Sequence, residues 1–195
     1  MASRAWRALG RGSVLGTLRA DVKRATREVL LVGPWIDDHV AAAVVEACAP
    51  AVALRVLTRP IESSSPGFAS HAAAAAARFA GRANTEVRTL ERLHAKVAVI
   101  DGRIGYVGSA NWYRFSLEES FEVVVRAELD DLGGLADELA SLWDQAERLE
   151  ARAGRQPASP RATGIGYREE VVDPVAAAVL AQVPGAFVIG RRRGR

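Results

Sequence analysis

The chain has 195 residues, a formal net charge of +3 and no long low-complexity run. This length suits one domain that buries a hydrophobic core. Cys48 is the only cysteine, which excludes both an internal disulfide framework and a cysteine-based zinc cluster.

The charges are unevenly distributed along the chain. Arginines are concentrated in residues 1–28 and 152–195, whereas acidic residues are concentrated in residues 117–150. A basic end can meet the phosphates of a nucleic acid or an anionic lipid surface, although a solvated terminus is the alternative. Arg4, Arg7 and Arg11 interrupt any apolar core of a signal peptide, so we expect a cytoplasmic protein.

An apolar segment lies near the C-terminus. Residues 174–190 are apolar apart from Gln182, and three arginines follow. A membrane-spanning helix needs about 20 apolar residues, so a packed or dimer-contacting tail is the preferred interpretation and membrane contact the alternative.

Hydrophobic periodicity and turn residues predict alternating helices and strands. In chain order we expect a helix over 15–27, a strand over 29–35, a helix from Asp37 or Asp38 to 49, a strand over 53–58, a helix over 67–80, strands over 86–90, 94–101, 104–110 and 121–127, and a helix over 131–151. Asp37 and Asp38 are interpreted first as helix caps and only second as catalytic acids.

This alternation predicts an α/β fold, a mixed β-sheet flanked by helices on both faces. We expect a basic N-terminal tail over 1–14, one catalytic domain over 15–151, and an Arg-rich linker and C-terminal tail over 152–195.

The most informative stretch contains His94, Lys96, Asp101, Ser109 and Asn111. Asp101-Gly102 is a hairpin signal, and if residue 101 faces 104, then 96 faces 109 and 94 faces 111. The imidazole, ammonium, hydroxyl and amide would then share one face without a carboxylate, which predicts a phosphate site. A one-residue slip of the turn would destroy this arrangement.

The lysine is itself informative, because this chain uses arginine almost everywhere else. Its only lysines are Lys23 and Lys96. An ammonium is a compact point charge and a guanidinium a planar fork, so the pocket should reject the larger group.

The residues His94, Lys96, Asp101, Gly108, Ser109 and Asn111 match every specified position of the pattern HxK(x)4D(x)6GSxN. The chain therefore resembles the phospholipase D superfamily, and residues 15–151 resemble one half-unit of that fold. The tails lie outside the resemblance.

The resemblance implies that His94 attacks phosphorus to give a phosphohistidine, with Lys96, Ser109 and Asn111 binding the phosphate and Asp101 as a further catalytic residue. The family's downstream acid, which orients the histidine, best matches Glu122, with Glu119 as second choice. No metal or other cofactor is expected.

The resemblance also implies a second histidine, which would protonate the leaving oxygen. His39 and His71 are not followed by lysine two positions later, so a homodimer should complete the site. Activity should then be bell-shaped in pH.

Three functions compete. The first is a nuclease, because small single-motif members of the family that act as dimers include endonucleases. The second is a phospholipase or phosphatidyltransferase acting on lipid, and the third is a non-catalytic nucleic-acid-binding module. Trp112 and Tyr113 could line a substrate cleft, or they could pack in the core.

Overall fold

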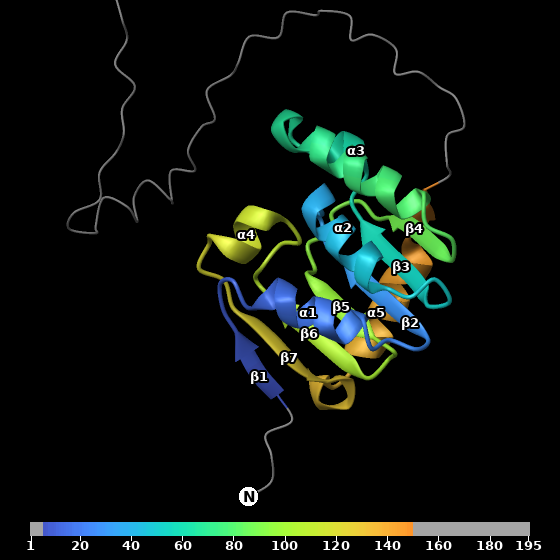
Figure 1. The fold of residues 1–195 in the computed structure, drawn as a ribbon. Coiled ribbons are helices and arrows are strands. Elements are labelled where there is room, and N and C mark those ends of the chain that lie inside the picture. The colour runs from blue at the N-terminus through green and yellow to red at the C-terminus, as the bar shows by residue number, and fades with distance from the viewer. Residues whose placement is uncertain (1–5, 150–195) are drawn as a thin grey trace, which may run out of the picture. The chain divides into compact units, whose positions relative to one another are not determined.

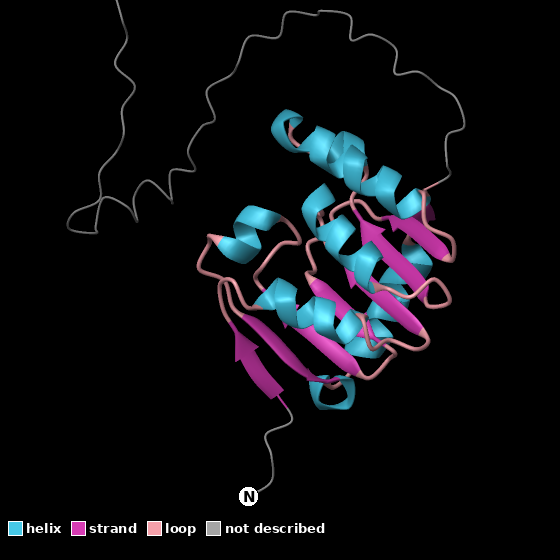
Figure 2. Ribbon diagram, viewed as in Figure 1, coloured by secondary structure: helices cyan, strands magenta, loops and turns pink. Residues whose placement is uncertain are grey.

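The computed structural model describes residues 6–149, which form one mixed β-sheet covered by helices (Figures 1 and 2). The strands are β1 (Trp6–Leu9), β2 (Glu28–Val32), β3 (Ala53–Thr58), β4 (Thr85–Thr89), β5 (Val97–Ile100), β6 (Ile104–Gly108), β7 (Val124–Glu128) and β8 (Glu147–Arg148). The helices are α1 (Val14–Val22), α2 (Asp38–Ala47), α3 (Pro66–Ala80), α4 (Arg114–Glu118) and α5 (Leu135–Gln145), with short 3-10 helices at Ile61–Ser63 and Leu129–Leu132.

The sheet has the order β1-β7-β6-β5-β2-β3-β4-β8. Strands β2, β3 and β4 are parallel, whereas β5 runs antiparallel to β2 and the β5-β6-β7-β1 half is antiparallel throughout. This arrangement confirms the predicted α/β class with a mixed sheet.

Two hydrophobic clusters cover the two faces of the sheet. Leu18 of α1, Val40 of α2 and Phe79 of α3 belong to one cluster, and Leu139 and Trp143 of α5 belong to the other. In Figure 1, α1 and α2 accordingly lie in front of the sheet and α5 behind it. Helices therefore flank both faces, as predicted.

Strand β5 shows why the sheet needs both layers. All four of its residues are buried, with Ala98 and Ile100 in the first cluster and Val97 and Val99 in the second. A strand that is apolar on both sides is stable only where both faces are covered.

The N-terminal segment differs from the prediction of a tail over residues 1–14. Within it, Trp6–Leu9 forms β1 and pairs antiparallel with β7. Only Leu9 is buried in this strand, so the sequence shows almost no alternation of buried and exposed residues. Backbone hydrogen bonds to β7 therefore hold the strand in place. The predicted linker and the apolar segment 174–190 lie outside the described residues.

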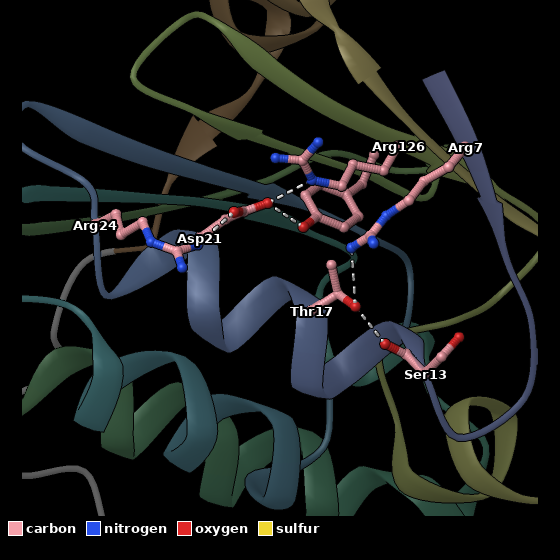
Figure 3. Close-up of polar contacts among 7 residues, drawn as sticks. Arg7, Ser13, Thr17, Asp21, Arg24 and Arg126 are labelled. Carbon is pink, nitrogen blue, oxygen red and sulfur yellow. Dashed lines mark hydrogen bonds and ion pairs between the residues drawn. The ribbon is translucent and has the colours of Figure 1, made fainter. Parts of the chain in front are cut away.

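A cluster of hydrogen-bonded polar side chains connects α1 to the sheet (Figure 3). The buried Asp21 accepts hydrogen bonds from the Tyr106 hydroxyl at 2.5 Å and from the Arg126 Nε at 2.6 Å. Burial by itself would raise the pKa of Asp21, but the hydrogen bonds from Arg126 and Tyr106 lower it overall. The carboxylate is therefore a charged structural link between α1, β6 and β7.

The hairpin between β5 and β6 is shifted by one residue from the predicted register. Ile100 pairs with Ile104, because Asp101 and Gly102 adopt φ values of +55° and +65° and form the centre of the turn. The Arg103 N–H closes this turn on the Ile100 carbonyl at 2.9 Å. The predicted pairing of residue 101 with 104 was therefore wrong. The alternation of side chains along the two strands does not by itself place the motif residues on one face of the sheet.

Within residues 6–149, no helix has both the length and the apolar character required to cross a bilayer.

Candidate active site

His94, Lys96, Ser109 and Asn111 lie beyond the same end of the central strands of the sheet. Because β2 and β3 are parallel and β5 is antiparallel to β2, the carboxyl ends of β2 and β3 meet the amino end of β5. The carboxyl end of β6 lies at the same edge. Open α/β sheets bind ligands outside the carboxyl ends of their parallel strands, so this edge is the expected place for a site.

His94 and Lys96 precede β5 and contact each other. The His94 side chain is exposed, whereas Lys96 retains only 9% of its exposed area. The Lys96 ammonium lies 3.0 Å from Nε2 of His94 and donates to the His94 backbone carbonyl at 2.9 Å. The ammonium also lies 3.3 Å from Nδ1, so it contacts both nitrogens of the ring. The structure thus brings an exposed imidazole ring and a buried cation together.

The surroundings of Lys96 act on its charge in opposite directions. Burial lowers the pKa of Lys96, the charge of Glu122 raises it, and Arg59 lowers it further, with a net decrease. Because the charge of Glu122 does not outweigh burial and Arg59, a phosphate bound at this position would stabilise the charged form of Lys96.

Glu122 does not occupy the predicted environment. We expected it inside a buried strand beside His94, but β7 begins at Val124, and Phe121 and Val123 are 92% and 59% exposed. Its carboxylate instead accepts hydrogen bonds from the hydroxyls of Ser109 and Ser116, the latter at 2.7 Å. Glu122 thus orients two serines, and its influence on Lys96 is electrostatic.

Ser109 is held from two sides. Its hydroxyl donates to Glu122 and accepts from the Val123 N–H at 3.3 Å. Gly108 permits this close approach, because a Cβ there would lie 2.2 Å from the Val123 carbonyl oxygen. The glycine of the motif therefore allows β6 to end against the segment that carries Glu122.

Asn111 and Trp112 follow on a loop that is anchored in the core. The Asn111 N–H donates to Ser116 at 2.9 Å, and its side-chain oxygen is buried without a hydrogen-bond partner among the described residues. Trp112 is 1% exposed and its Nε1 donates to the Val32 carbonyl at 2.7 Å. Its ring packs on Gly33, so Trp112 does not line a cleft but fixes the loop against β2. Tyr113, by contrast, is half-buried and faces a groove.

Asp101 lies at the opposite end of β5 and does not join the cluster. Its carboxylate accepts the backbone N–H groups of Thr26, Arg27 and Glu28 at distances between 2.8 and 3.2 Å. Burial opposes these bonds, but they lower its pKa to about 2. We therefore replace the predicted catalytic role of Asp101 by a structural one, the fixing of the β5-β6 turn to the start of β2.

The sequence prediction missed Arg59 and Trp35. Arg59 directly follows β3, donates from Nε to the Leu93 carbonyl at 2.7 Å, and lies 5.4 Å from the Trp35 ring. The Trp35 ring meets the His94 ring edge to face at 6.2 Å. Both residues could have been found because they lie within three residues of the carboxyl ends of the parallel strands β2 and β3.

Residues 6–149 contain no group of three or more His, Cys, Asp or Glu side chains arranged to hold an ion.

The fold and this edge define a class of protein. The sequence matches the family described as cardiolipin synthase, PLD-like domain, over residues 18–143. The chain therefore belongs to the phospholipase D superfamily and is an enzyme of its phosphodiesterase class.

Solved structures with the same fold include NucT from Helicobacter pylori, at 14% identity and a TM-score of 0.61, over 73% of this chain and 98% of that one. The phospholipase D family member Nuc from Salmonella typhimurium has 16% identity and a TM-score of 0.58, over 73% of this chain and 97% of that one. TrmBL2, an archaeal chromatin protein with a novel mode of DNA binding, has 13% identity and a TM-score of 0.54, over 76% of this chain and 56% of that one. No curated protein sequence matches.

Proposed function

We propose that the protein is a nuclease that hydrolyses phosphodiester bonds of nucleic acids through His94, without a metal ion. The observation that carries this proposal is the contact between the exposed His94 ring and the buried Lys96 ammonium. An imidazole ring that reaches the surface can act as a nucleophile through its unprotonated nitrogen, and a cation beside it can stabilise the negative charge that develops on phosphate oxygens.

The proposed reaction has two steps. In the first, Nε2 of His94 attacks phosphorus, the bond from phosphorus to the leaving oxygen breaks, and a second histidine gives its proton to that oxygen. In the second, the same histidine takes a proton from water, the water oxygen bonds to phosphorus, and the bond to His94 breaks. Lys96 and Asn111 are the residues we assign to the phosphate oxygens.

The histidines of the described residues do not supply the second group. His39 pairs with Glu118 at 3.2 Å, and the His71 ring lies beside Phe68 at 6.0 Å. We therefore propose a homodimer in which His94 of both copies meets at one phosphate. The strongly exposed Phe121 and Val123, which flank Glu122, provide apolar surface at this edge for a second copy to cover.

Nucleic acid is the substrate class we prefer over lipid. TrmBL2, a protein of similar fold, binds DNA, which favours nucleic acid. The description of the matching family names cardiolipin synthase, which represents the lipid alternative. The largely apolar cavity under Ile36, Phe79 and Val87 has a volume of only about 20 Å³, room for one water, so an acyl chain would have to lie in an open groove at the surface.

A cleavage assay tests the substrate class. Wild-type and His94→Ala proteins would be incubated in excess chelator with labelled single-stranded DNA, double-stranded DNA, RNA and phosphatidylcholine. We expect nucleic-acid cleavage that resists the chelator and disappears in His94→Ala. Lipid turnover with nucleic acid intact would overturn the proposal, and so would binding of nucleic acid without any cleavage.

A mixed dimer tests the shared site. Co-expression of differently tagged wild-type and His94→Ala chains gives a heterodimer that contains one His94. If both copies of His94 serve one phosphate, its activity should be below about a tenth of wild type. A heterodimer with half the wild-type activity would show that each chain works alone.

A further inference from the structure

A groove lies beside His94 that the reaction itself does not require. It has a volume of about 540 Å³, within the range of about 300–1,000 Å³ that is usual for small-molecule sites. Its lining residues are Trp35, Ser63, Ser64, Ser65, Phe68 and Tyr113. They come from the segment after β2, the segment between β3 and α3, α3 itself and the start of α4.

The aromatic side chains of this groove are partly exposed and held in fixed positions. Trp35 stands perpendicular to His94, with an interplanar angle of 89°, and Arg59 lies over its ring. Phe68 and Tyr113 meet at 5.7 Å and 64° on the same groove. All three are half-buried, so each ring is packed by the protein and still presents surface to a ligand.

The charges around the groove favour an anionic ligand. None of its six lining residues is acidic, although the Ser63 hydroxyl contacts Glu91 at 3.1 Å. The neighbouring hollow differs, because Asp37, Asp38 and Glu119 contribute to its lining. Among residues 6–149, no carboxylate forms an ion pair with Arg59, which lies over Trp35, or with Lys96, which contacts His94, so both cations are available to phosphates.

The shape and polarity of the groove distinguish between two possible ligands, an acyl chain and a nucleobase. An acyl chain would need an enclosed apolar channel, whereas this groove is open and three serine hydroxyls contribute to its wall. A nucleobase has a flat face for the aromatic rings and polar edges for hydroxyl groups, and it is covalently linked to the phosphate that His94 would attack.

We propose that this groove holds an unpaired base next to the scissile phosphate, with Trp35 as the stacking surface and Tyr113 and Phe68 at its far side. The substrate is therefore a single strand, because a base within a duplex must leave its stack before it can enter. This inference rests on the proposed nuclease function and adds strand preference to it.

The test compares one strand with and without bases. The first substrate is a single-stranded DNA oligonucleotide, the second is the same strand with stable tetrahydrofuran abasic residues, and the third is the corresponding duplex. Wild-type protein should prefer the first over the other two. Trp35→Leu should lose about tenfold more kcat/KM on the normal strand than on the abasic strand, the effect of one lost stacking contact.

Two further variants separate stacking from folding. Trp35→Phe keeps an aromatic face and should recover most of the loss, and Tyr113→Leu should repeat the selective loss from the other side of the groove. Thermal unfolding of each variant checks the fold. Equal losses on normal and abasic strands, or a wild-type preference for the duplex, would overturn this inference and leave the nuclease standing. If wild-type protein cleaves no nucleic acid, the proposed function falls and the inference with it.

Discussion

Charged side chains at the two ends of the central strands differ in whether the protein itself supplies their partners. At the amino end of β2, Asp101 is satisfied by three consecutive backbone N–H groups, and nearby Asp21 is held by Tyr106 and Arg126. At the carboxyl end, Lys96 and Arg59 stand beside His94 without a carboxylate ion pair within the described residues.

This difference distinguishes structural from functional charge. A buried charge that the protein neutralises itself holds the fold together, because its removal leaves the partner unpaired. A cluster of like charges without ion-pair contacts is instead held in place by the rest of the fold and attracts an ion of opposite sign. The comparison predicts that substitutions at one end cost activity and that those at the other end cost stability.

The largest effect is expected for His94→Ala. Loss of the nucleophile should reduce kcat by about 10⁴-fold or more, since the remaining groups can only bind the substrate. Thermal unfolding should change little, because the His94 side chain is exposed. His39→Ala is the matched control and should keep its activity. Substantial cleavage by His94→Ala would exclude His94 as the nucleophile.

Lys96→Arg should have the next largest effect on activity. Lys96 is 9% exposed, and its ammonium contacts both the ring and the carbonyl of His94, so a guanidinium does not fit without moving His94. We expect kcat to fall by about 10²–10³-fold, the size of the effect when one charge-stabilising donor is lost. The conservative change Arg59→Lys serves for comparison and should cost less. A Lys96→Arg variant that cleaves at the wild-type rate would contradict the expectation that this pocket rejects a guanidinium.

At the structural end, Asp21→Ala should lower the free energy of unfolding by about 3 kcal/mol, because it leaves Arg126 and the buried Tyr106 hydroxyl without their acceptor. Urea unfolding measures this loss. Cleavage activity per folded molecule should persist, because Asp21 has no contact with the motif. A loss of activity without a loss of stability would contradict the purely structural role that we assign to Asp21.

The smallest effect, and one that depends on pH, is expected for Asp101→Asn. The folded pKa of Asp101 is about 2 and lies below its ordinary value of 3.8, so its stabilising effect is complete above that ordinary value and is lost as the pH falls toward about 2. Wild-type protein should therefore be more stable than Asp101→Asn at neutral pH, and the difference should shrink in acid. Thermal unfolding over this range measures it, with Asp130→Asn on the exposed 3-10 helix as control. A difference that does not vary with pH would contradict this role.

The sequence by itself determined the fold class and the motif. Runs such as Val97–Ile100 are apolar on both faces and can only be central strands, and Ala53–Thr58 was predicted at its observed bounds. The identities and spacing of His94, Lys96 and Asn111 likewise follow from the sequence, because the resemblance to the family depends on residue order and not on distance.

Tertiary structure alone decided how those residues are arranged. The turn at Asp101 was misplaced by one residue because several loop lengths suit an Asp-Gly pair, and only the backbone conformation selects one of them. Glu122 was assigned to a buried strand because its neighbours are apolar, yet Phe121 and Val123 point into solvent. Arg59 and Trp35 reach His94 only because parallel pairing of β2 and β3 aligns their carboxyl ends. Contacts between segments distant in sequence depend on strand order and register, which local patterns do not encode.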